Sequence, residues 1–437
     1  MLTNHGIHLN NPVTRKIKRT RFQLIFTKIS IELVEFKTPM SVRRTLMAIA
    51  NSRFNKFLSS LGVIVALLAT QLFFTTNTAF AKEKVTIAII SFSPYAPWYI
   101  VQKKGMAKDI EIDVQIIDDI NAKNAGLTTG TLQCMLNTLD TVVVARSAGL
   151  PVKHIAIPAM SYGLDEMVVT KDITSVNDFP GKTFGADYGF LNHMWMLLNL
   201  KKAGIGFDEV KHAVMLPWDS AAAFVSGGLD IDVNYIPFSK QSLELPGSHV
   251  LKTSLSDRTW ERGLISESMA CNEDWLAAKP EVAKEIVRAW FEAVNWWKEN
   301  PEEGNEIVAK ALDWPVSDVK LTQYGAVMLN LDQNLGAFGI GSGKPVCGSL
   351  PNGAEAREVP AGSSGWGELL FDGAPDCVAG YVYPTWDVFG SIYKEAGVID
   401  TAASTDIGID TTILSALDGA GYTDRYSSNK WIGRLGE

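Results

Sequence analysis

The sequence lacks the usual signatures of metal sites and of several large enzyme classes. Its four cysteines include no CxxC pair, so the spacing typical of a zinc ribbon is absent. It contains no Gly-x-Ser-x-Gly, His-Glu-x-x-His or Walker A motif. Its 36 glycines and 18 prolines have no fixed period, which excludes collagen-like and low-complexity chains. We therefore expect a globular protein that is not an enzyme and that binds neither a metal nor a cofactor.

Basic residues are scarce in most of the chain. Residues 1–81 carry 11 lysines and arginines and 2 acidic residues, whereas the other 356 residues carry 29 basic and 46 acidic side chains. Nucleic-acid binding needs clustered lysine and arginine to contact phosphates. An acidic body of this kind argues against nucleic acid as a partner.

The length of 437 residues predicts two or three domains.

The N-terminal extension has the pattern of an export signal. Basic residues precede residues 58–74, the longest uncharged apolar run, and a small-x-small sequence follows at 79–81. We expect a signal peptide cleaved after Ala81 and a periplasmic mature chain. An uncleaved membrane anchor is the alternative. Initiation at Met40 or Met47 would shorten the segment that precedes the apolar run.

Strand and helix patterns alternate after residue 81, which predicts an α/β fold with mostly parallel sheets. Short β-branched runs predict strands, and amphipathic runs with glycine or proline at their ends predict helices. In the helix expected at residues 281–300, Ile286, Trp290 and Val294 recur at helical spacing, which predicts a buried stripe. The expected strands are 85–91, 112–117, 167–170, 183–186, 214–216 and 231–235, and the expected helices are 97–108, 121–130, 192–203 and 281–300.

Six segments, taken together and in this order, resemble one protein family. They are residues 130–140 (GTLQCMLNTLD), 148–152 (AGLPV), 161–165 (SYGLD), 176–183 (VNDFPGKT), 224–237 (FVSGGLDIDVNYIP) and 272–282 (NEDWLAAKPEV). The set is similar to the periplasmic solute-binding subunits of ABC importers in the nitrate/sulfonate/taurine and thiamine-precursor group. The similarity covers about residues 84–310, and the chain departs from the family after about residue 330.

The resemblance implies a two-lobed periplasmic-binding-protein fold of type II, with two crossover segments between the lobes. From the chain order we expect lobe 1 at residues 82–171 and 263–400, lobe 2 at residues 172–262 and a tail at residues 401–437. The resemblance also implies that the protein is a monomer. It would capture a small molecule in the interlobe cleft and deliver it to a membrane permease and, through the permease, to a cytoplasmic ATPase.

Two other functions are compatible with this scaffold. Pyrimidine synthases of thiamine biosynthesis and some menaquinone-pathway enzymes resemble it. Those enzymes are cytosolic, and the synthases carry a cysteine-rich run that this chain lacks. A periplasmic ligand sensor would require a fused transmembrane segment and an output domain, for which the sequence shows no pattern. We therefore prefer the binding protein of an importer.

Ligands of open α/β sheets bind beyond the carboxyl ends of the strands. Residues 92–98, 161–163 and 187–193 lie at such strand ends or crossovers, and in the family these regions face the ligand. The resemblance therefore implies ligand contacts from Trp98, Asn137, Thr138, Ser161, Tyr162, Asp187, Tyr188 and His193, and from Trp218 and Asn234 in lobe 2.

The composition of these segments favours a small cationic or neutral nitrogen compound over a sulfonate. They contain aromatic rings and carboxyl groups but no lysine or arginine. Aromatic faces and carboxylates both attract cations. A general acid and base pair would need facing carboxyls, whereas adjacent side chains diverge. We therefore interpret Asp118-Asp119 and Asp165-Glu166 as solvated pairs.

The cysteines predict one disulfide. Cys347 and Cys377 flank an irregular segment rich in glycine and proline, and an oxidising periplasm permits their pairing. Cys134 and Cys271 lie among apolar or strand-like residues, where we expect buried free thiols.

Overall fold

The computed structural model describes residues 82–257, 263–350 and 379–434. The chain divides into two units, Met1–Ala81 and Lys82–Glu437, and every described residue belongs to the second unit. The predicted signal peptide and its cleavage point therefore lie outside the described residues. Within the described ranges, none of the helices combines the length and the apolar character that a membrane span requires.

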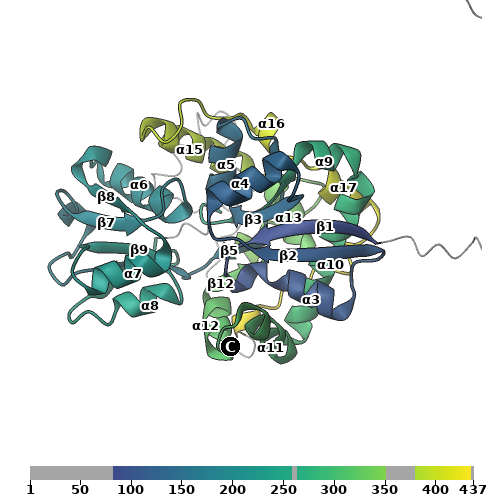
Figure 1. Ribbon diagram of the computed structural model, residues 1–437, viewed down its shortest axis with the longest axis horizontal. Coiled ribbons are helices and arrows are strands. Elements are labelled where there is room, and N and C mark those ends of the chain that lie inside the picture. Colours follow the sequence, from purple (N-terminus) through teal and green to yellow (C-terminus); the bar gives the residue numbers. More distant parts are fainter. Residues whose placement is uncertain (1–81, 258–262, 351–378, 435–437) are drawn as a thin grey trace, which may run out of the picture. The chain divides into compact units, whose positions relative to one another are not determined.

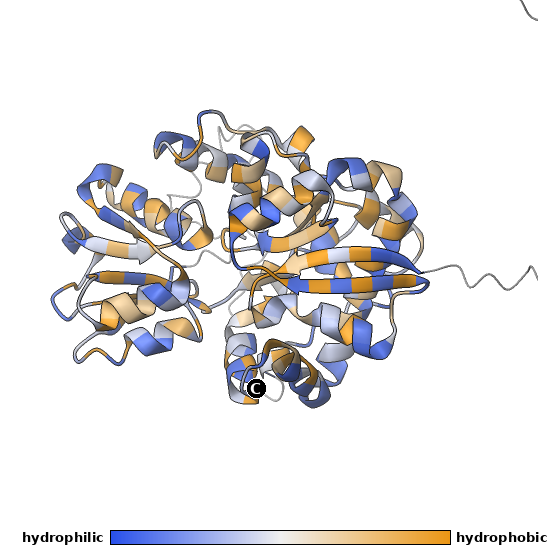
Figure 2. Ribbon diagram, in the orientation of Figure 1, coloured by the Kyte–Doolittle hydropathy of each residue, from blue (hydrophilic) through white to orange (hydrophobic). Residues whose placement is uncertain are grey.

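The first sheet consists of five strands in the order β2-β1-β3-β11-β4 (Figure 1). Its strands are β1 (Glu83–Ile89), β2 (Ile110–Ile116), β3 (Cys134–Thr138), β4 (Val152–Ala156) and β11 (Glu267–Asn272). β1 pairs in parallel with β2 and β3, whereas β11 runs antiparallel between β3 and β4. β3 and β11 are buried along their whole length, and β2 alternates hydrophobic and hydrophilic residues, as a half-exposed edge strand does (Figure 2).

The second sheet also has five strands, in the order β10-β6-β9-β7-β8. They are β6 (Asp165–Val169), β7 (Thr183–Ala186), β8 (Lys211–Val214), β9 (Ile231–Tyr235) and β10 (His249–Thr253). β7 pairs in parallel with β8 and β9, and β6 runs antiparallel to β9 and β10. β6 and β9, in the interior of the sheet, are buried throughout.

Helices cover both sheets. The second sheet has α6 (Leu191–Ala203) on one side and α7 (Pro217–Val225) and α8 (Phe238–Ser242) on the other (Figure 1). The remaining α-helices are α3 (Pro97–Lys104), α4 (Ile120–Thr129), α5 (Leu139–Ser147), α9 (Glu273–Ala278), α10 (Pro280–Glu299), α11 (Pro301–Leu312), α12 (Val316–Gly325), α13 (Leu331–Phe338), α15 (Val382–Glu395), α16 (Thr405–Gly408) and α17 (Thr412–Gly419). Short 3-10 helices are η1 (Ser93–Tyr95), η2 (Val176–Asp178), η3 (Phe207–Glu209), η5 (Val346–Ser349) and η6 (Ile432–Arg434).

Local chemistry sets the helix bounds that the sequence predicted. Asp119 caps α4, because its Oδ1 accepts a hydrogen bond of 2.8 Å from the amide of Ala122. α10 begins at a proline and is strongly amphipathic, and its Ile286, Trp290 and Val294 are completely buried. The predicted buried stripe of this helix is therefore confirmed.

Two segments connect the sheets: the outgoing one lies between β4 and β6, and the returning one lies between β10 and β11. The outgoing segment contains β5 (Ala159–Ser161), which pairs antiparallel with β12 (Ala326–Met328), a strand that follows α12. The Ser161 hydroxyl lies 2.7 Å from the Ser254 hydroxyl, just after β10. The amide of Gly163 donates to the same Ser254 oxygen at 2.7 Å. The outgoing and returning segments therefore meet at one serine.

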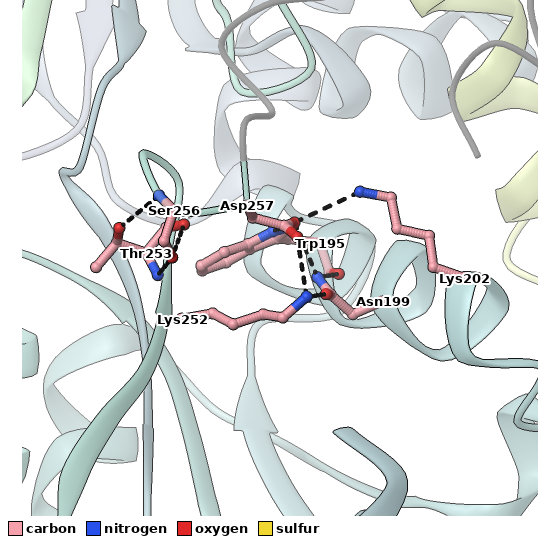
Figure 3. Close-up of polar contacts among 7 residues, drawn as sticks. All are labelled: Trp195, Asn199, Lys202, Lys252, Thr253, Ser256 and Asp257. Carbon is pink, nitrogen blue, oxygen red and sulfur yellow. Dashed lines mark hydrogen bonds and ion pairs between the residues drawn. The ribbon is translucent and has the colours of Figure 1, made fainter. Parts of the chain in front are cut away.

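A buried carboxylate attaches the end of β10 to helix α6 (Figure 3). Asp257 accepts hydrogen bonds of 2.9 Å from Trp195 Nε1 and from Lys252 Nζ, and Lys202 lies 3.7 Å away. Burial alone would raise the pKa of Asp257, but these partners lower it below its usual value. The chain is therefore anchored to the second sheet's own helix immediately before it returns to the first sheet.

The structure differs from the sequence prediction in strand direction and in one boundary. The sheets are mixed rather than mostly parallel, because β6 and β11 enter their sheets directly from the connecting segments, without a helical return. Residues 167–170, predicted as a strand within lobe 1, lie mainly in β6 and so in the second sheet, ahead of the expected boundary at residue 171. We propose that the second lobe comprises residues 165–253.

Cys134 and Cys271 form a disulfide, which corrects their interpretation as free thiols. They face each other in the antiparallel β3–β11 pair, with Cα atoms 4.0 Å apart. Sequence reasoning did not foresee this pairing of strands far apart in the chain. Cys347 is buried and disulfide-bonded. Cys377 lies outside the described residues, so the Cys347–Cys377 bond stays a prediction.

Replacing Cys134 and Cys271 together by alanine should lower the free energy of unfolding by about 4 kcal/mol, because the bond restrains a long stretch of the unfolded chain. The two residues are 137 positions apart in sequence. Denaturant titration of the mature chain measures the change. Alkylation of either thiol in unfolded but unreduced protein would contradict the pairing.

Candidate functional site

A cavity lies where strand ends of the two sheets meet. The space between its lining atoms, part of which is open solvent, amounts to about 280 Å³. The residues that line it are Ile90, Phe92, Tyr95, Thr138, Leu164, Asp165, Phe190, Leu191, Asn192, Tyr235 and Glu267.

Strand direction explains which residues reach the cavity. The parallel strands β1, β3 and β9 end at this edge, so the residues at or after their carboxyl ends line it. β6 and β11 run the opposite way, so each brings its first residue to the same edge. The register places Asp165 opposite Tyr235, and Glu267 opposite Thr138. Each sheet thus supplies one carboxyl group to the cavity.

Burial raises the pKa of both carboxyl groups. Tyr95 donates a hydrogen bond to Glu267, but burial raises the pKa of Glu267 well above its usual range. Burial also raises the pKa of Asp165 to about 7, and the Ser161 hydroxyl offsets this only in part. Burial therefore favours the protonated form of Glu267, which can donate as well as accept a hydrogen bond, whereas Asp165 titrates close to neutrality.

Aromatic rings form an apolar part of the cavity. Phe92 lies edge-to-face with Tyr95, at a centroid distance of 5.1 Å, and with Tyr235, at 5.4 Å. Tyr235 contacts Phe238 at 5.3 Å in the same manner. Edge-to-face packing fixes the orientation of each ring. These rings offer rigid contact area next to the two carboxyl groups.

Two asparagines supply further polar atoms. The side-chain amides of Asn137 and Asn192 are buried, and neither has a hydrogen-bond partner within the described ranges. Asn192 lines the cavity in the first turn of α6, and Asn137 directly precedes Thr138. A buried polar group without a partner costs about 1–3 kcal/mol, so a bound molecule that satisfies the amides would be favoured.

Lys123 is a functional candidate that sequence reasoning missed. It lies in α4, is completely buried, and its Nζ has no hydrogen-bond partner among the residues that the structure describes. Burial lowers the pKa of Lys123 to about 7, although the carboxyl groups of Asp118, Asp187 and Glu267 oppose the change. No local pattern indicates this burial, since a lysine in a polar helix is ordinarily exposed.

Of the predicted contact residues, Thr138 lines the cavity, whereas Tyr188 and His193 are not among its lining residues. Tyr188 is 48% exposed, and its ring centroid is 5.3 Å from that of His193 and 6.0 Å from that of His212. Burial lowers the pKa of His193 to about 3, so its ring is neutral. Phe190, which lies between Tyr188 and His193 in the sequence, does line the cavity.

Two predicted aromatic contacts pack elsewhere. Trp98 lies in the first turn of α3, where its ring meets Trp290 of α10 at 5.0 Å. Tyr162 contacts Trp431 at 5.1 Å and the guanidinium of Arg434 at 5.4 Å. Neither is among the lining residues, because the elements that carry them turn these rings toward neighbouring helices.

The other predicted contacts have structural partners. Ser161 bonds to Ser254 between the sheets, as described above. Asn234 donates to the carbonyl of Pro217 at 2.7 Å, and Trp218 packs near Phe238 at 5.9 Å. Asp187 accepts a hydrogen bond from the amide of Tyr188 and does not line the cavity.

Two of the segments expected to contact the ligand do contribute to the cavity, but through residues other than the predicted ones. Residues 92–98 supply Phe92 and Tyr95, and residues 187–193 supply Phe190, Leu191 and Asn192. The spacing of residues within each turn could have identified these contacts. That spacing can be used only when the bounds of η1 and α6 are known. Tyr235 and Glu267 depended on strand register, which the sequence alone does not reveal.

The acidic pair Asp165-Glu166 is buried rather than solvated, which corrects the sequence interpretation. Successive residues of a strand point to opposite faces. Asp165 lines the cavity, whereas Glu166 accepts hydrogen bonds from Ser239 at 2.6 Å and from Lys240 at 3.0 Å. The two carboxyl groups therefore occupy different environments, and only the first belongs to the candidate site.

Comparison with known proteins agrees with the predicted resemblance. Residues 93–304 match the model of the family described as NMT1/THI5 like. The riboflavin-binding protein RibY of Chloroflexus aurantiacus is 25% identical over 271 residues, which cover 57% of this chain and 76% of RibY. A protein of Brucella abortus described as a binding protein is 30% identical over 161 residues, 37% of this chain and half of its own length.

Solved structures identify the fold. The sulfonate-binding periplasmic protein SsuA of Methylobacillus flagellatus has a TM-score of 0.53 at 15% identity, over 78% of this chain and 96% of its own. The ligand-binding component of an ABC-type import system from Staphylococcus aureus has a TM-score of 0.54 at 10% identity, over 76% of this chain and 98% of its own. The predicted periplasmic-binding-protein fold is confirmed. The relatives in sequence are described as binding proteins, in agreement with the predicted resemblance.

Replacing Asp165 by asparagine should change how the stability of the ligand-free protein depends on pH. The folded pKa of about 7 lies above the unfolded value of about 4, so the folded chain binds more protons between these values. The wild type should therefore lose stability as the pH rises from about 5 to about 8, and Asp165→Asn should lose less. Urea titrations across this range measure both slopes.

Asp172→Asn is the matched control. Asp172 pairs with Lys182 at 2.7 Å on the surface, and its hydrogen bonds from Lys182 and Thr170 lower its pKa to about 2. It stays ionised over the whole range, so its replacement should leave the pH slope unchanged. Equal slopes in the wild type and in Asp165→Asn would contradict the assignment of a raised pKa to Asp165.

Proposed function

We propose that this chain is the extracytoplasmic binding protein of an ABC importer for a small, neutral or cationic nitrogen compound. The observation that carries the proposal is the cavity itself. Two buried carboxyl groups, Asp165 and Glu267, lie beside aromatic rings, and none of the lining residues is lysine, arginine or histidine. A protonated carboxyl can donate to a ring nitrogen or a carbonyl, and an ionised one can bind a cation.

A sulfonate is a weaker candidate for this cavity. Its permanent negative charge would lie beside two groups that become carboxylates as the pH rises, and the amide of Asn192 would be a main donor to it. Lys123 adds one positive charge nearby, but four carboxyl groups already act on it electrostatically, those of Asp118, Asp119, Asp187 and Glu267. The likeness to sulfonate-binding proteins is one of fold, whereas RibY, named for binding a nitrogen heterocycle, is the more similar in sequence.

The proposal includes the rest of the transport pathway. Residues 1–81 would direct export, with cleavage after Ala81, and the mature chain would act as a periplasmic monomer. The apolar run at 58–74 and the small-x-small sequence at 79–81 support this. A membrane permease and, through it, a cytoplasmic ATPase would be the partners, as for other binding proteins of importers.

Binding rather than catalysis is the proposed role. The cavity lining has no serine, cysteine or histidine that could act as a nucleophile or base. Carboxyl groups with raised pKa values would also suit general acid catalysis. Recovery of the ligand chemically unchanged after long incubation with the protein separates these roles, and a new product would contradict the proposal.

Titration calorimetry of the mature chain should show micromolar binding of riboflavin or an aminopyrimidine, and none of an alkanesulfonate. Asp165→Asn should weaken binding about tenfold or more, since a hydrogen bond to a charged group contributes about 1.5–3 kcal/mol. Glu166→Gln is the matched control, because Glu166 lies on the opposite face of β6 and pairs with Lys240. Binding of the sulfonate alone, unaffected by Asp165→Asn, would overturn the proposal.

A further inference from the structure

Helix α15 connects the two halves of the fold, although it lies outside residues 93–304, which match the family model. It packs against α5 on one side and α6 on the other (Figure 1). Trp386 Nε1 donates to the carbonyl of Ala403 at 2.7 Å, and the amide of Ala403 donates to the hydroxyl of Ser147, at the end of α5, at 2.9 Å. At its other end, Glu395 forms an ion pair with Lys201 of α6.

Tyr393 joins these two sides at a single buried hydroxyl. Its ring is fully buried, and its Oη lies 2.6 Å from Asp140 Oδ2 and 3.2 Å from the carbonyl oxygen of Phe190. Asp140 lies in the first turn of α5, two residues after Thr138. Phe190 is the N-cap residue of α6 and lines the cavity. The hydroxyl therefore links the first turn of α5 to the N-cap residue of α6.

One hydrogen serves two acceptors in this contact. A tyrosine hydroxyl has a single hydrogen, so Tyr393 shares it between the Asp140 carboxyl and the Phe190 carbonyl. When the Asp140 carboxyl holds a proton, it can donate to Tyr393 Oη, and Tyr393 then donates to the Phe190 carbonyl alone. Burial raises the pKa of Asp140 to about 6, so the carboxyl gains this proton as the pH falls below that value. Asp165, Glu267 and Tyr95 are further titratable groups within electrostatic reach of Asp140.

We propose that Tyr393 is a positioning residue, and that α15 acts as a brace that holds Phe190 and the first turn of α6 against α5 when no ligand is bound. The brace shapes the cavity before binding, and such preorganisation lowers the cost of ordering it around a ligand. The inference goes beyond the proposed function, and it does not depend on which molecule the cavity takes.

Hydrogen exchange of the ligand-free mature chain tests the brace. In Tyr393→Phe, which keeps the ring, amides of residues 187–195 should exchange about fivefold faster than in the wild type, as expected for the loss of one hydrogen bond. Amides of β1 and β3 should be unchanged, which shows that the fold persists. Tyr383→Phe, at the opposite end of the same helix, is the matched control. Unchanged exchange at 187–195 in folded Tyr393→Phe would overturn the proposal.

Asp140→Asn gives a second, independent readout if Tyr393→Phe does not fold. The amide of the new asparagine can donate to Tyr393 Oη, which leaves the tyrosine hydrogen for the Phe190 carbonyl. Exchange at residues 187–195 should then be as slow as in the wild type or slower. Faster exchange in this variant would show that Tyr393 does not act through Phe190.

Discussion

The antiparallel pairing of β11 with β3 determines the position of both the covalent crosslink and the cavity. At one end of this pair the register sets Cys271 opposite Cys134, and at the other end it sets Glu267 opposite Thr138. A slip by one residue would turn every side chain of β11 to the opposite face. The carboxyl group would then leave the cavity, and the cysteines would no longer face each other. A single register therefore supports both features.

The same arrangement recurs in the second sheet, where β6 brings Asp165 beside Tyr235 of β9. In both sheets the strand that arrives from a connecting segment runs against its neighbour, so its first residue enters the region between the sheets. Acidic residues at these two positions are costly to bury in ionised form. Desolvation raises the pKa of both, and Tyr95 is the direct partner of Glu267. Gain or loss of a proton therefore changes the number of hydrogen-bond donors and acceptors that the site presents.

Local periodicity sufficed to predict most of the individual elements. Strands β7 and β9 have the predicted bounds, and α10 has the predicted buried stripe, because burial on one or two faces leaves a repeat in the sequence. Strand pairing over long distances leaves no such repeat. The Cys134–Cys271 bond, the direction of β6 and the burial of Glu267 all depend on it.

Site residues were predictable by segment but not by side chain. The loop after β1 does reach the cavity, yet the 3-10 turn η1 directs Phe92 and Tyr95 inward, whereas Trp98 begins a helix that packs on α10. Similarly, Tyr162 belongs to a connecting segment at the site but meets Trp431 from the C-terminal end of the chain. Such contacts depend on residues hundreds of positions away in the chain. The sequence around Trp98 or Tyr162 does not indicate which distant residues these are.

Under the proposed export, the order of the cysteines along the chain has a consequence for oxidative maturation. A chain threaded across a membrane N-terminus first exposes its cysteines to the oxidising side one after another, and Cys271 is the next cysteine after Cys134. Joining each new thiol to the last unpaired one therefore yields the Cys134–Cys271 bond before Cys347 emerges. A protein whose bonds form consecutively in this way does not depend on an isomerase to exchange wrong partners, a step that takes seconds to hours when it is needed.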